Sequence, residues 1–437
     1  MKVSKGQELW NKASEIIPGG NMLLSKNKNI FSPDKWPCYY KKAKGNSVWD
    51  IDGNKYIDFS QNGVGSCSLG YAFEPIDAAV IEALKLGVMS TLNTTYEVEL
   101  ASKLIELHPE LDMVKFARTG GEANSIAVRI ARANKSKSKI AICGYHGWHD
   151  WYLSTNISKD DRLQEHLLKG LGAKGVPVEL AGTTIPIRYN CFEDLNCLKE
   201  DNDIAALKME VVRSQEPKEG FLEEIRDICD DKNIILIFDE CTSGFRQSFG
   251  GIYKNYGIVP DMLILGKALG NGYAITSILG KRTIMESAIE TFISSTFWTE
   301  AIGPAAALAT LKEMEKQKSW EKLPMIGKSI KNIWLNLAEK YSIPIMVSGI
   351  DALASFQFKN EESSLYKTAF VELMLKNGIL ASTLFYPTTA HTLEDVNFYK
   401  EKLEIVFNIL SECLNNSRNI KDVCPNEISR PSFSRLN

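Results

Sequence analysis

The stretch DMLILGKALGNGYAI, residues 261–275, contains a short apolar run that leads into a lysine and a glycine-rich turn. Met262 to Leu265 are typical of a strand buried in a protein core, and Lys267 follows one glycine later. Lysine is rarely buried without a partner, although its long side chain can also reach solvent from a buried backbone. Lys267 at this strand end is therefore either a functional amine or an ordinary surface lysine.

Similar apolar runs recur from about residue 112 onward, and amphipathic stretches separate them. Strand-like runs that alternate with helical patterns indicate βαβ units and a mostly parallel central sheet with helices on both faces. An Asp-Gly pair inside residues 47–59 predicts a hairpin in the N-terminal part of the chain. We expect an α/β protein whose large domain spans residues 71–310, with residues 1–70 and 311–437 forming a smaller α+β domain.

The composition is ordinary for a globular protein, with 44% hydrophobic and 24% charged residues among 437. The net charge of −3 gives no reason to expect nucleic acid or an anionic membrane as a partner. No apolar run reaches the roughly 18 residues of a membrane span, and the N-terminal residues lack the apolar core of a secretory signal. Nine scattered cysteines without a CxxC pair fit a reducing compartment, so we expect a cytoplasmic protein.

Polar residues follow the predicted strands, at the edge of an open α/β sheet where ligands bind. In chain order they are Thr119, Gly120, Gly121, Glu122, Tyr145, His146, Glu210, Asp239, Glu240 and Lys267. Taken singly, each has an ordinary explanation, such as a turn for the glycine pair or a cap for an aspartate. His146 and His149 are spaced to share a metal ion, but no third ligand stands out nearby, so no metal site is predicted.

Taken together, four of these features match the needs of pyridoxal 5'-phosphate (PLP). The amine of Lys267 suits a Schiff base with the cofactor's aldehyde, and Asp239 suits the pyridinium nitrogen, which needs a carboxylate to stay protonated. Gly120 and Gly121 open a predicted helix, whose backbone N–H groups suit a phosphate. Tyr145 offers an aromatic face for the flat ring. The residues therefore predict a PLP enzyme.

Two longer segments, IFDECTSGFR (237–246) and PDMLILGKALGNGY (260–273), resemble the signature of class III aminotransferases of fold type I. The likeness extends to residues 18–20, 48–59, 117–133, 145–150 and 294–311. Within the class, the chain is most similar to glutamate-1-semialdehyde 2,1-aminomutase and its transaminase-like relatives. The resemblance implies the fold of the PLP-dependent transferases of fold type I.

The resemblance also implies roles for the residues at the ring of the cofactor. Lys267 corresponds to the Schiff-base lysine, which also carries the proton between substrate and cofactor carbons. Asp239 corresponds to the partner of the pyridinium nitrogen, and Tyr145 to the stacking residue. His146 and Glu210 are further cofactor-binding candidates, although the proline that usually follows the glutamate is valine in this chain.

At the phosphate, Thr119, Gly120 and Gly121 stand where the family usually has Ser-Gly-Thr. The missing hydroxyl at Gly121 implies that backbone donors carry more of the phosphate binding. Thr296 matches a threonine that, in the family, reaches the phosphate of the neighbouring subunit. The resemblance therefore implies a homodimer with a shared active site.

Three departures from the aminomutase pattern concern the substrate. Lys26 stands where the aminomutase has an arginine for the substrate carboxylate, and lysine lacks the bidentate fork of arginine. The run ASTLFYPTTAHT (381–392) contains no acidic residue where the aminomutase carries a glutamate. FWTE (297–300) replaces the usual Ser-Gly-Asn-Pro. This variant resembles aminotransferases of sugar and surface-polysaccharide pathways.

Arg213 competes with Lys26 as the residue that binds the carboxylate of the amino donor, because it lies three residues past Glu210. An exposed surface arginine would explain its position equally well. The region of the family's gate, residues 151–185, contains many small residues, which predicts mobility rather than a particular substrate.

The leading interpretation is a PLP-dependent transaminase that moves an amino group from an amino-acid donor to a keto or aldehyde acceptor by a ping-pong mechanism. The alternative enzyme is a glutamate-1-semialdehyde-type 2,1-aminomutase. A third interpretation is a PLP-fold protein that has lost catalysis and serves as a binding or regulatory module. The presence of Lys267, Asp239 and Tyr145 together argues against the third.

Overall fold

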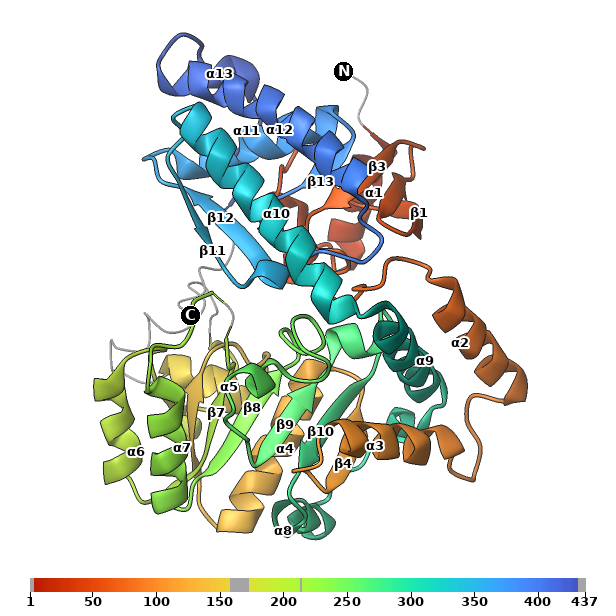
Figure 1. Ribbon diagram of the computed structural model, residues 1–437, viewed down its shortest axis with the longest axis vertical. Coiled ribbons are helices and arrows are strands. Elements are labelled where there is room, and N and C mark those ends of the chain that lie inside the picture. Colours follow the sequence, from red (N-terminus) through yellow and green to blue (C-terminus); the bar gives the residue numbers. More distant parts are fainter. Residues whose placement is uncertain (1–3, 158–172, 213, 431–437) are drawn as a thin grey trace. The chain divides into compact units, whose positions relative to one another are not determined.

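The computed structural model of the chain describes residues 4–157, 173–212 and 214–430. These residues form two compact units (Figure 1). Residues up to 73 combine with those from 321 onward in the first unit, and residues 74–320 form the second. The first unit is called the small unit below, and the second the large unit.

A seven-stranded sheet forms the centre of the large unit, in the strand order β4-β10-β9-β8-β7-β5-β6. Its strands are β4 (Met113–Ala117), β5 (Lys139–Cys143), β6 (Thr184–Pro186), β7 (Ile204–Met209), β8 (Ile235–Glu240), β9 (Met262–Leu265) and β10 (Thr276–Gly280). The strands from β9 to β6 pair in parallel, and this confirms the expected α/β fold with a mostly parallel sheet. The apolar runs MVKFART (113–119), KIAICG (139–144), AALKME (205–210), NIILIFD (233–239) and MLILG (262–266) each predict a strand, and they coincide with β4, β5, β7, β8 and β9 to within one or two residues.

Strand β10 is, with the short β6, one of two strands of this sheet that the sequence reasoning missed. It lies between β4 and β9 and runs antiparallel to both. Its residues follow the glycine-rich turn after Lys267, and a short strand next to such a turn has no helical connection to reveal it. Strands β5, β7, β8 and β9 pair in parallel, so the reversed direction of β10 does not affect them. Their carboxyl ends lie at one edge of the sheet.

Every residue of strands β7 to β10 is buried, which requires cover on both faces of the sheet. Helix α4 (Gly120–Lys135) lies against β4, β7, β8, β9 and β10. The apolar residues of α4 pack with Ile140, Ile142, Ile237 and Ile264 in one core cluster. The remaining helices of the large unit are α2 (Glu74–Leu86), α3 (Thr95–Leu107), α5 (Asp150–Leu153), α6 (Asn196–Glu200), α7 (Phe221–Asp231), α8 (Arg282–Met285) and α9 (Ile302–Gln317).

The small unit contains two sheets, of order β1-β2-β3-β13 and β11-β12-β14. Their strands are β1 (Tyr40–Lys44), β2 (Ser47–Asp50), β3 (Lys55–Phe59), β11 (Ile345–Ser348), β12 (Ala354–Phe358), β13 (Ile379–Ala381) and β14 (Leu384–Phe385). The expected hairpin forms between β2 and β3, which pair antiparallel. The helices are α1 (Lys5–Ile16), α11 (Ser363–Lys376), α12 (Leu393–Leu414) and α13 (Ile420–Val423), together with α10 (Ser319–Lys340), whose first residues belong to the large unit.

One sequence expectation falls partly outside the described residues, because the expected gate region at 151–185 includes residues 158–172. Among the described helices, none combines the length and apolar character needed to cross a membrane.

Candidate active site

Lys267 and Asp239 lie at the same edge of the central sheet. Strands β8 and β9 pair in parallel with Asp239 opposite Ile264, and Lys267 follows two residues after the end of β9. The Nζ atom of Lys267 donates a hydrogen bond of 2.7 Å to Oγ1 of Thr242, which follows β8. The half-buried amine is therefore held beside the end of β8.

The backbone at Lys267 has an unusual conformation that depends on its neighbours. Lys267 has a φ of 44°, in the left-handed region that non-glycine residues seldom adopt. A Cβ atom on Gly266 would lie 2.9 Å from Cγ2 of Thr276 and 3.2 Å from Sγ of Cys241, so only glycine fits there. Strain of this kind persists where the surrounding structure fixes a functional side chain.

Asp239 is almost completely buried at the end of β8, and its carboxylate has three neighbours. Oδ2 accepts a hydrogen bond of 2.9 Å from Nδ1 of His146 and lies 3.6 Å from Nζ of Lys208. Oδ1 accepts a hydrogen bond of 3.1 Å from the backbone N–H of Cys241. Burial by itself would raise the pKa of Asp239, but Lys208 and His146 outweigh it and hold this pKa well below its usual range. The carboxylate is therefore ionised.

His146 lies against Asp239 in the same buried region and is neutral. Burial lowers the pKa of His146, and the nearby Lys208 lowers it further. Because the Asp239 carboxylate only accepts, Nδ1 carries the proton of the imidazole. Nε2 is buried and has no hydrogen-bond partner among the residues that the structure describes.

The sequence analysis did not single out Lys208. It lies inside β7, where every residue is buried, and its side chain is 0% exposed. Burial lowers the pKa of Lys208, while the Asp239 carboxylate acts in the opposite direction. The available signal was a lysine inside the otherwise apolar run IAALKM. It was missed because candidate residues were sought only at the ends of the predicted strands.

Glu210 and Tyr145 meet at the ends of β7 and β5. The backbone N–H of Tyr145 donates a hydrogen bond of 3.2 Å to Oε2 of the buried Glu210. The half-buried Tyr145 ring contacts Tyr152 edge-to-face, with 5.9 Å between the ring centroids. Glu210 thus positions the loop that carries both Tyr145 and His146.

Helix α4 begins at the glycine pair that the sequence analysis assigned to a phosphate. Thr119 is the N-cap, and it forms a capping box with Glu122: the N–H of Glu122 donates to the Thr119 hydroxyl at 3.4 Å, and Oε2 of Glu122 accepts the Thr119 N–H at 2.8 Å. The first backbone N–H groups of a helix point outward and carry partial positive charge. The backbone N–H groups at Gly120 and Gly121 are therefore of the kind that suits an anion.

The structure explains the loss of the hydroxyl at Gly121. A Cβ atom on Gly121 would lie 2.7 Å from Cε1 and 2.9 Å from Nδ1 of His149, which is closer than real Cβ contacts. The His149 ring thus occupies the space that a threonine side chain would need. Its Nδ1 atom is buried without a hydrogen-bond partner in the described part of the chain. Sequence reasoning considered His149 only as a metal ligand and missed this contact.

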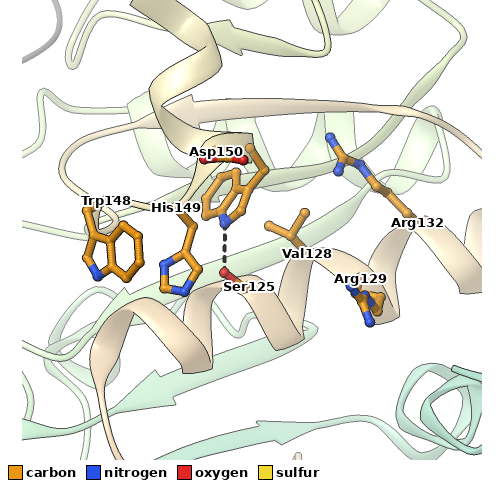
Figure 2. Close-up of a pocket in the computed structure, with 8 residues that line it drawn as sticks. Ser125, Val128, Arg129, Arg132, Trp148, His149 and Asp150 are labelled. Atoms are coloured by element: carbon orange, nitrogen blue, oxygen red, sulfur yellow. Dashed lines mark hydrogen bonds between the residues drawn. The ribbon is translucent and has the colours of Figure 1, made fainter. Parts of the chain in front are cut away.

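His149 also borders a cavity of about 500 Å³ beside α4 (Figure 2). Trp148 stacks on His149 with 4.5 Å between the ring centroids, and the two rings face the start of α4. Nε1 of Trp151 donates a hydrogen bond of 3.0 Å to Oγ of Ser125, which ties residues 148–151 to the helix. The other residues that line the cavity are Val128, Arg129, Arg132 and Asp150. Neither Lys267 nor Asp239 lines it, so this cavity is separate from the amine and the carboxylate.

The segment FWTE is attached to the same helix start. Nε1 of Trp298 donates to Oε1 of Glu122 at 3.2 Å, and the Arg118 guanidinium lies 3.0 Å from the Glu300 carboxylate. Thr296 immediately precedes this segment and is exposed in the 3-10 turn Thr296–Thr299. The replacement of the family's Ser-Gly-Asn-Pro thus creates an anchor for the segment that carries Thr296.

The two candidates for the substrate carboxylate are not among these contacts. Lys26 belongs to the small unit, in the 3-10 turn Leu24–Lys26. Arg213 lies outside the described residues. The choice between them stays a prediction.

The residues of the large unit fit PLP by their chemistry. A carboxylate that stays ionised is suited to a pyridinium nitrogen, and a half-buried amine on a neighbouring strand end is suited to an aldehyde. The glycine pair leaves the start of α4 open to a phosphate, with Cys241 Sγ at 3.6 Å as the nearest atom to a Cβ on Gly120. In the described residues, no group of three or more His, Cys, Asp or Glu side chains is arranged to hold a metal ion.

Comparison with known proteins gives the same class. The chain matches the class III aminotransferase family over residues 30–414, and it belongs to that family. It is 32% identical to the 3-aminobutyryl-CoA aminotransferase of Cloacimonas acidaminovorans over 418 residues, which are 92% of this chain and 96% of that protein. It is 30% identical to the glutamate-1-semialdehyde 2,1-aminomutase of Methanosphaera stadtmanae over 430 residues, covering 93% and 98% of the two chains.

The fold is shared with solved structures of PLP enzymes. The FumI protein of Sphingopyxis sp. MTA144, solved with PLP, superposes with a TM-score of 0.85 at 23% identity and covers 96% of this chain and 99% of its own. A transaminase with PLP bound superposes with a TM-score of 0.81 at 22% identity, covering 94% and 99%. The protein is therefore a PLP-dependent aminotransferase of class III, as the sequence predicted.

Proposed function

We propose that this aminotransferase is an intermolecular transaminase, which takes an amino group from an amino-acid donor and passes it to a separate keto or aldehyde acceptor. The observation that carries the proposal is the arrangement at one sheet edge, where the ionised Asp239 and the amine of Lys267 follow neighbouring parallel strands. When bound, PLP draws electrons from the donor's α-carbon and so weakens its C–H bond. The protein must then hold the cofactor and move one proton.

Asp239 and Lys267 divide this work. Asp239, fixed by His146 and by the N–H of Cys241, would pair with the pyridine nitrogen and keep it protonated. Lys267 would hold the aldehyde end and, once displaced by the donor amine, would carry the proton from the α-carbon. Thr242 accepts a hydrogen bond from Nζ of Lys267 and so aims the amine.

The other candidates would hold the remaining parts of the cofactor. Tyr145 would stack on the ring, with Glu210 fixing its backbone. Gly120 and Gly121 would bind the phosphate through their backbone N–H groups. The backbone N–H of Glu122 would not take part, because it already donates to the Thr119 hydroxyl.

Thr296 would bind the phosphate of a partner subunit, and this would make the protein a homodimer with shared sites. Its exposure is consistent with this role, since an exposed hydroxyl is free to reach a second chain. The segment that carries it is held by Trp298 and Glu300, which bind Glu122 and Arg118.

Transaminase is favoured over aminomutase by the substrate-binding positions. An aminomutase must retain its diamino intermediate until the second half-reaction, and this needs firm polar anchoring. Lys26 replaces the arginine of the aminomutase pattern, and residues 381–392 lack its glutamate. The aminomutase remains the second candidate because a curated aminomutase is 30% identical over nearly the whole chain.

The acceptor is proposed to be a keto or aldehyde compound other than glutamate-1-semialdehyde. Sugar-derived ketones are one class, because FWTE resembles the segment of sugar and surface-polysaccharide aminotransferases. Acyl-CoA substrates are another class to include in a screen, because one relative is a 3-aminobutyryl-CoA aminotransferase.

The experiment uses the protein loaded with PLP and follows the absorption band of the bound cofactor. An amino donor alone should convert the enzyme to its pyridoxamine phosphate form, with one equivalent of keto product per site. A separate acceptor should then restore the original spectrum. Lys267→Ala is the inactive control. Efficient isomerisation of glutamate-1-semialdehyde without any second substrate would refute the transaminase and establish the aminomutase.

A further inference from the structure

Lys208 is a buried lysine that no step of the proposed reaction uses. In the register of the sheet it lies between Ile142 of β5 and Ile237 of β8, and both isoleucines belong to the apolar core cluster under α4. Its side chain is 0% exposed. Lysine is almost never fully buried in proteins unless it is paired, so its position requires a specific reason.

The amine of Lys208 has one close ionic partner in the described structure, which is Asp239. Nζ lies 3.6 Å from Oδ2 of Asp239 and has no hydrogen-bond partner within the described ranges. The other titratable groups that face it are Glu210 directly after β7, His146 after β5 and Cys241 after β8. The Cys241 thiol stays neutral because burial raises its pKa well above the usual value.

This arrangement is a poor way to stabilise a fold. A buried ion pair recovers its desolvation cost only when its geometry is close and its remaining donors are satisfied. The 3.6 Å separation and the unsatisfied Nζ meet neither condition. An apolar side chain of similar length would pack better between Ile142 and Ile237. The observation therefore points to a role for the charge of Lys208 at Asp239.

We propose that Lys208 is a positioning residue that competes with the pyridine nitrogen of PLP for the Asp239 carboxylate. This inference rests on the proposed pairing of Asp239 with that nitrogen. Before the cofactor binds, Lys208 and His146 keep the buried Asp239 ionised and oriented. After PLP binds, the positive charges of Lys208 and the pyridinium lie beside the same carboxylate and repel each other. Lys208 therefore reduces the stabilisation of the protonated pyridine nitrogen by Asp239.

The charge of Lys208 thus lowers the proton affinity of the cofactor nitrogen below the value that Asp239 alone would set. Two measurable properties follow. The pyridine nitrogen loses its proton at a lower pH than it would without Lys208. The folding stability depends more on Lys208 in the protein without PLP than in the protein with PLP. This is because the bound pyridinium can replace Lys208 as the positive charge beside Asp239.

The test compares wild type with Lys208→Met, which keeps the length of the side chain and removes its charge. Each protein is loaded with PLP labelled with ¹⁵N in the ring, and the nitrogen's NMR chemical shift is followed against pH. The melting temperature is also measured with and without PLP. Lys115→Met, on β4 of the same sheet, is the matched control for removal of a partly buried lysine.

In Lys208→Met, the pH midpoint of the pyridine nitrogen should rise by about one unit, which is about a tenfold increase in its proton affinity. PLP should also raise the melting temperature of Lys208→Met more than that of wild type. Lys115→Met should match wild type in both respects. Lys208→Gln, which keeps a polar but neutral group, gives the same comparison if Lys208→Met does not fold.

An unchanged midpoint in the neutral variants would overturn the inference, and so would an equal loss of stability with and without PLP. Asp239→Asn separates this failure from a failure of the proposed pairing. If Asp239→Asn lowers the midpoint and Lys208→Met leaves it unchanged, the pairing stands and the role of Lys208 is refuted. If Asp239→Asn has no effect either, the pairing itself is wrong.

Discussion

The core of the small unit and the edge of the central sheet that carries Asp239 and Lys267, called the site edge below, both contain buried polar groups. The two regions differ in how these groups are paired. In the small unit, Trp334 is fully buried among aromatic side chains, and its Nε1 donates a hydrogen bond of 2.8 Å to the hydroxyl of Tyr399. Both groups are neutral and paired. At the site edge, Lys208, Asp239 and His146 are buried together, and Nζ of Lys208 and Nε2 of His146 have no hydrogen-bond partner in the described chain.

This difference separates residues that stabilise the fold from residues that serve the reaction. A neutral, satisfied pair such as Trp334 and Tyr399 costs little to bury and fixes the packing of its neighbours. Buried ionised groups with unsatisfied atoms cost free energy, so they persist where a ligand or a reaction uses them. The comparison predicts that substitutions at the edge affect the reaction, whereas substitutions in the small core affect stability.

Adjacent residues on β8 repeat the contrast. Asp239 faces Lys208 and His146, and its pKa is held below the usual range although burial opposes this. Glu240 points to the opposite face, where burial raises its pKa to about 7 despite hydrogen bonds from the N–H groups of Ile252 and Tyr253. Neighbouring carboxylates in one strand thus differ because only Asp239 has a lysine amine and an imidazole N–H beside it.

The largest expected effect is that of Lys267→Ala. Loss of the amine should lower turnover by at least about a thousandfold, because it removes both the attachment of the cofactor and the proton carrier. The free energy of unfolding without PLP should stay close to that of wild type, since Lys267 is not a core residue. Steady-state kinetics and urea unfolding measure the two quantities. Lys232→Ala, on the exposed surface, is the control, and turnover near wild type in Lys267→Ala would exclude the assignment.

Trp334→Ala should give the opposite result. Removal of the buried indole leaves a cavity and an unpaired Tyr399 hydroxyl, so the free energy of unfolding should fall by about 3–5 kcal/mol. Urea unfolding followed by tryptophan fluorescence and circular dichroism measures this loss. Leu335→Ala, on the exposed side of the same helix, should change stability by less than about 0.5 kcal/mol. Equal effects of the two variants would contradict the role of the small unit's core.

Thr296→Ala should have a smaller effect that is confined to the cofactor. Loss of one hydrogen bond to a phosphate from the neighbouring subunit should weaken PLP binding by roughly 1.5–3 kcal/mol. Equilibrium dialysis of PLP measures the change, at protein concentrations above and below the dissociation constant of the dimer. Ser294→Ala is the control in the same exposed segment. A fully active monomer with normal PLP affinity would show that the site is not shared.

At neutral pH the smallest effect is that of His108, a buried histidine of the large unit with a neutral partner, because its contribution appears only as the pH falls. Its Nδ1 is 2.8 Å from the hydroxyl of Tyr253, and burial, together with the nearby Lys254, lowers its pKa to about 3. Below pH 6.5 the unfolded chain binds a proton at His108 and the folded chain does not, so acid favours unfolding. The contribution is about 1.4 kcal/mol per pH unit at most, and it accumulates between pH 6.5 and 3.

Urea unfolding of wild type and His108→Gln at several pH values between 7 and 4.5 checks this prediction. The loss of stability with falling pH should be smaller in the variant, whatever its stability at pH 7. Parallel pH profiles would show that His108 does not bind its proton differently in the folded and unfolded chains.

The sequence by itself determined five of the seven strands of the central sheet, their order along the chain and the residue types at their ends. Apolar runs predicted β7, β8 and β9 because a buried strand must be apolar on both faces. Lys267 and Asp239 were found because the ends of parallel strands converge on one edge, so linear position is enough to bring them together. The family resemblance then supplied the remaining assignments of the cofactor.

Only the tertiary structure decided which side chains touch across that edge. The 3.6 Å approach of Lys208 to Asp239 depends on the pairing register of β7 with β8, and the His149 ring on Gly121 depends on the path of a loop. The antiparallel β10 and the anchoring of Trp298 on Glu122 are contacts of the same kind. Hydrophobic periodicity records whether a residue is buried, but it does not record its neighbours, because these are fixed by packing between segments far apart in the chain.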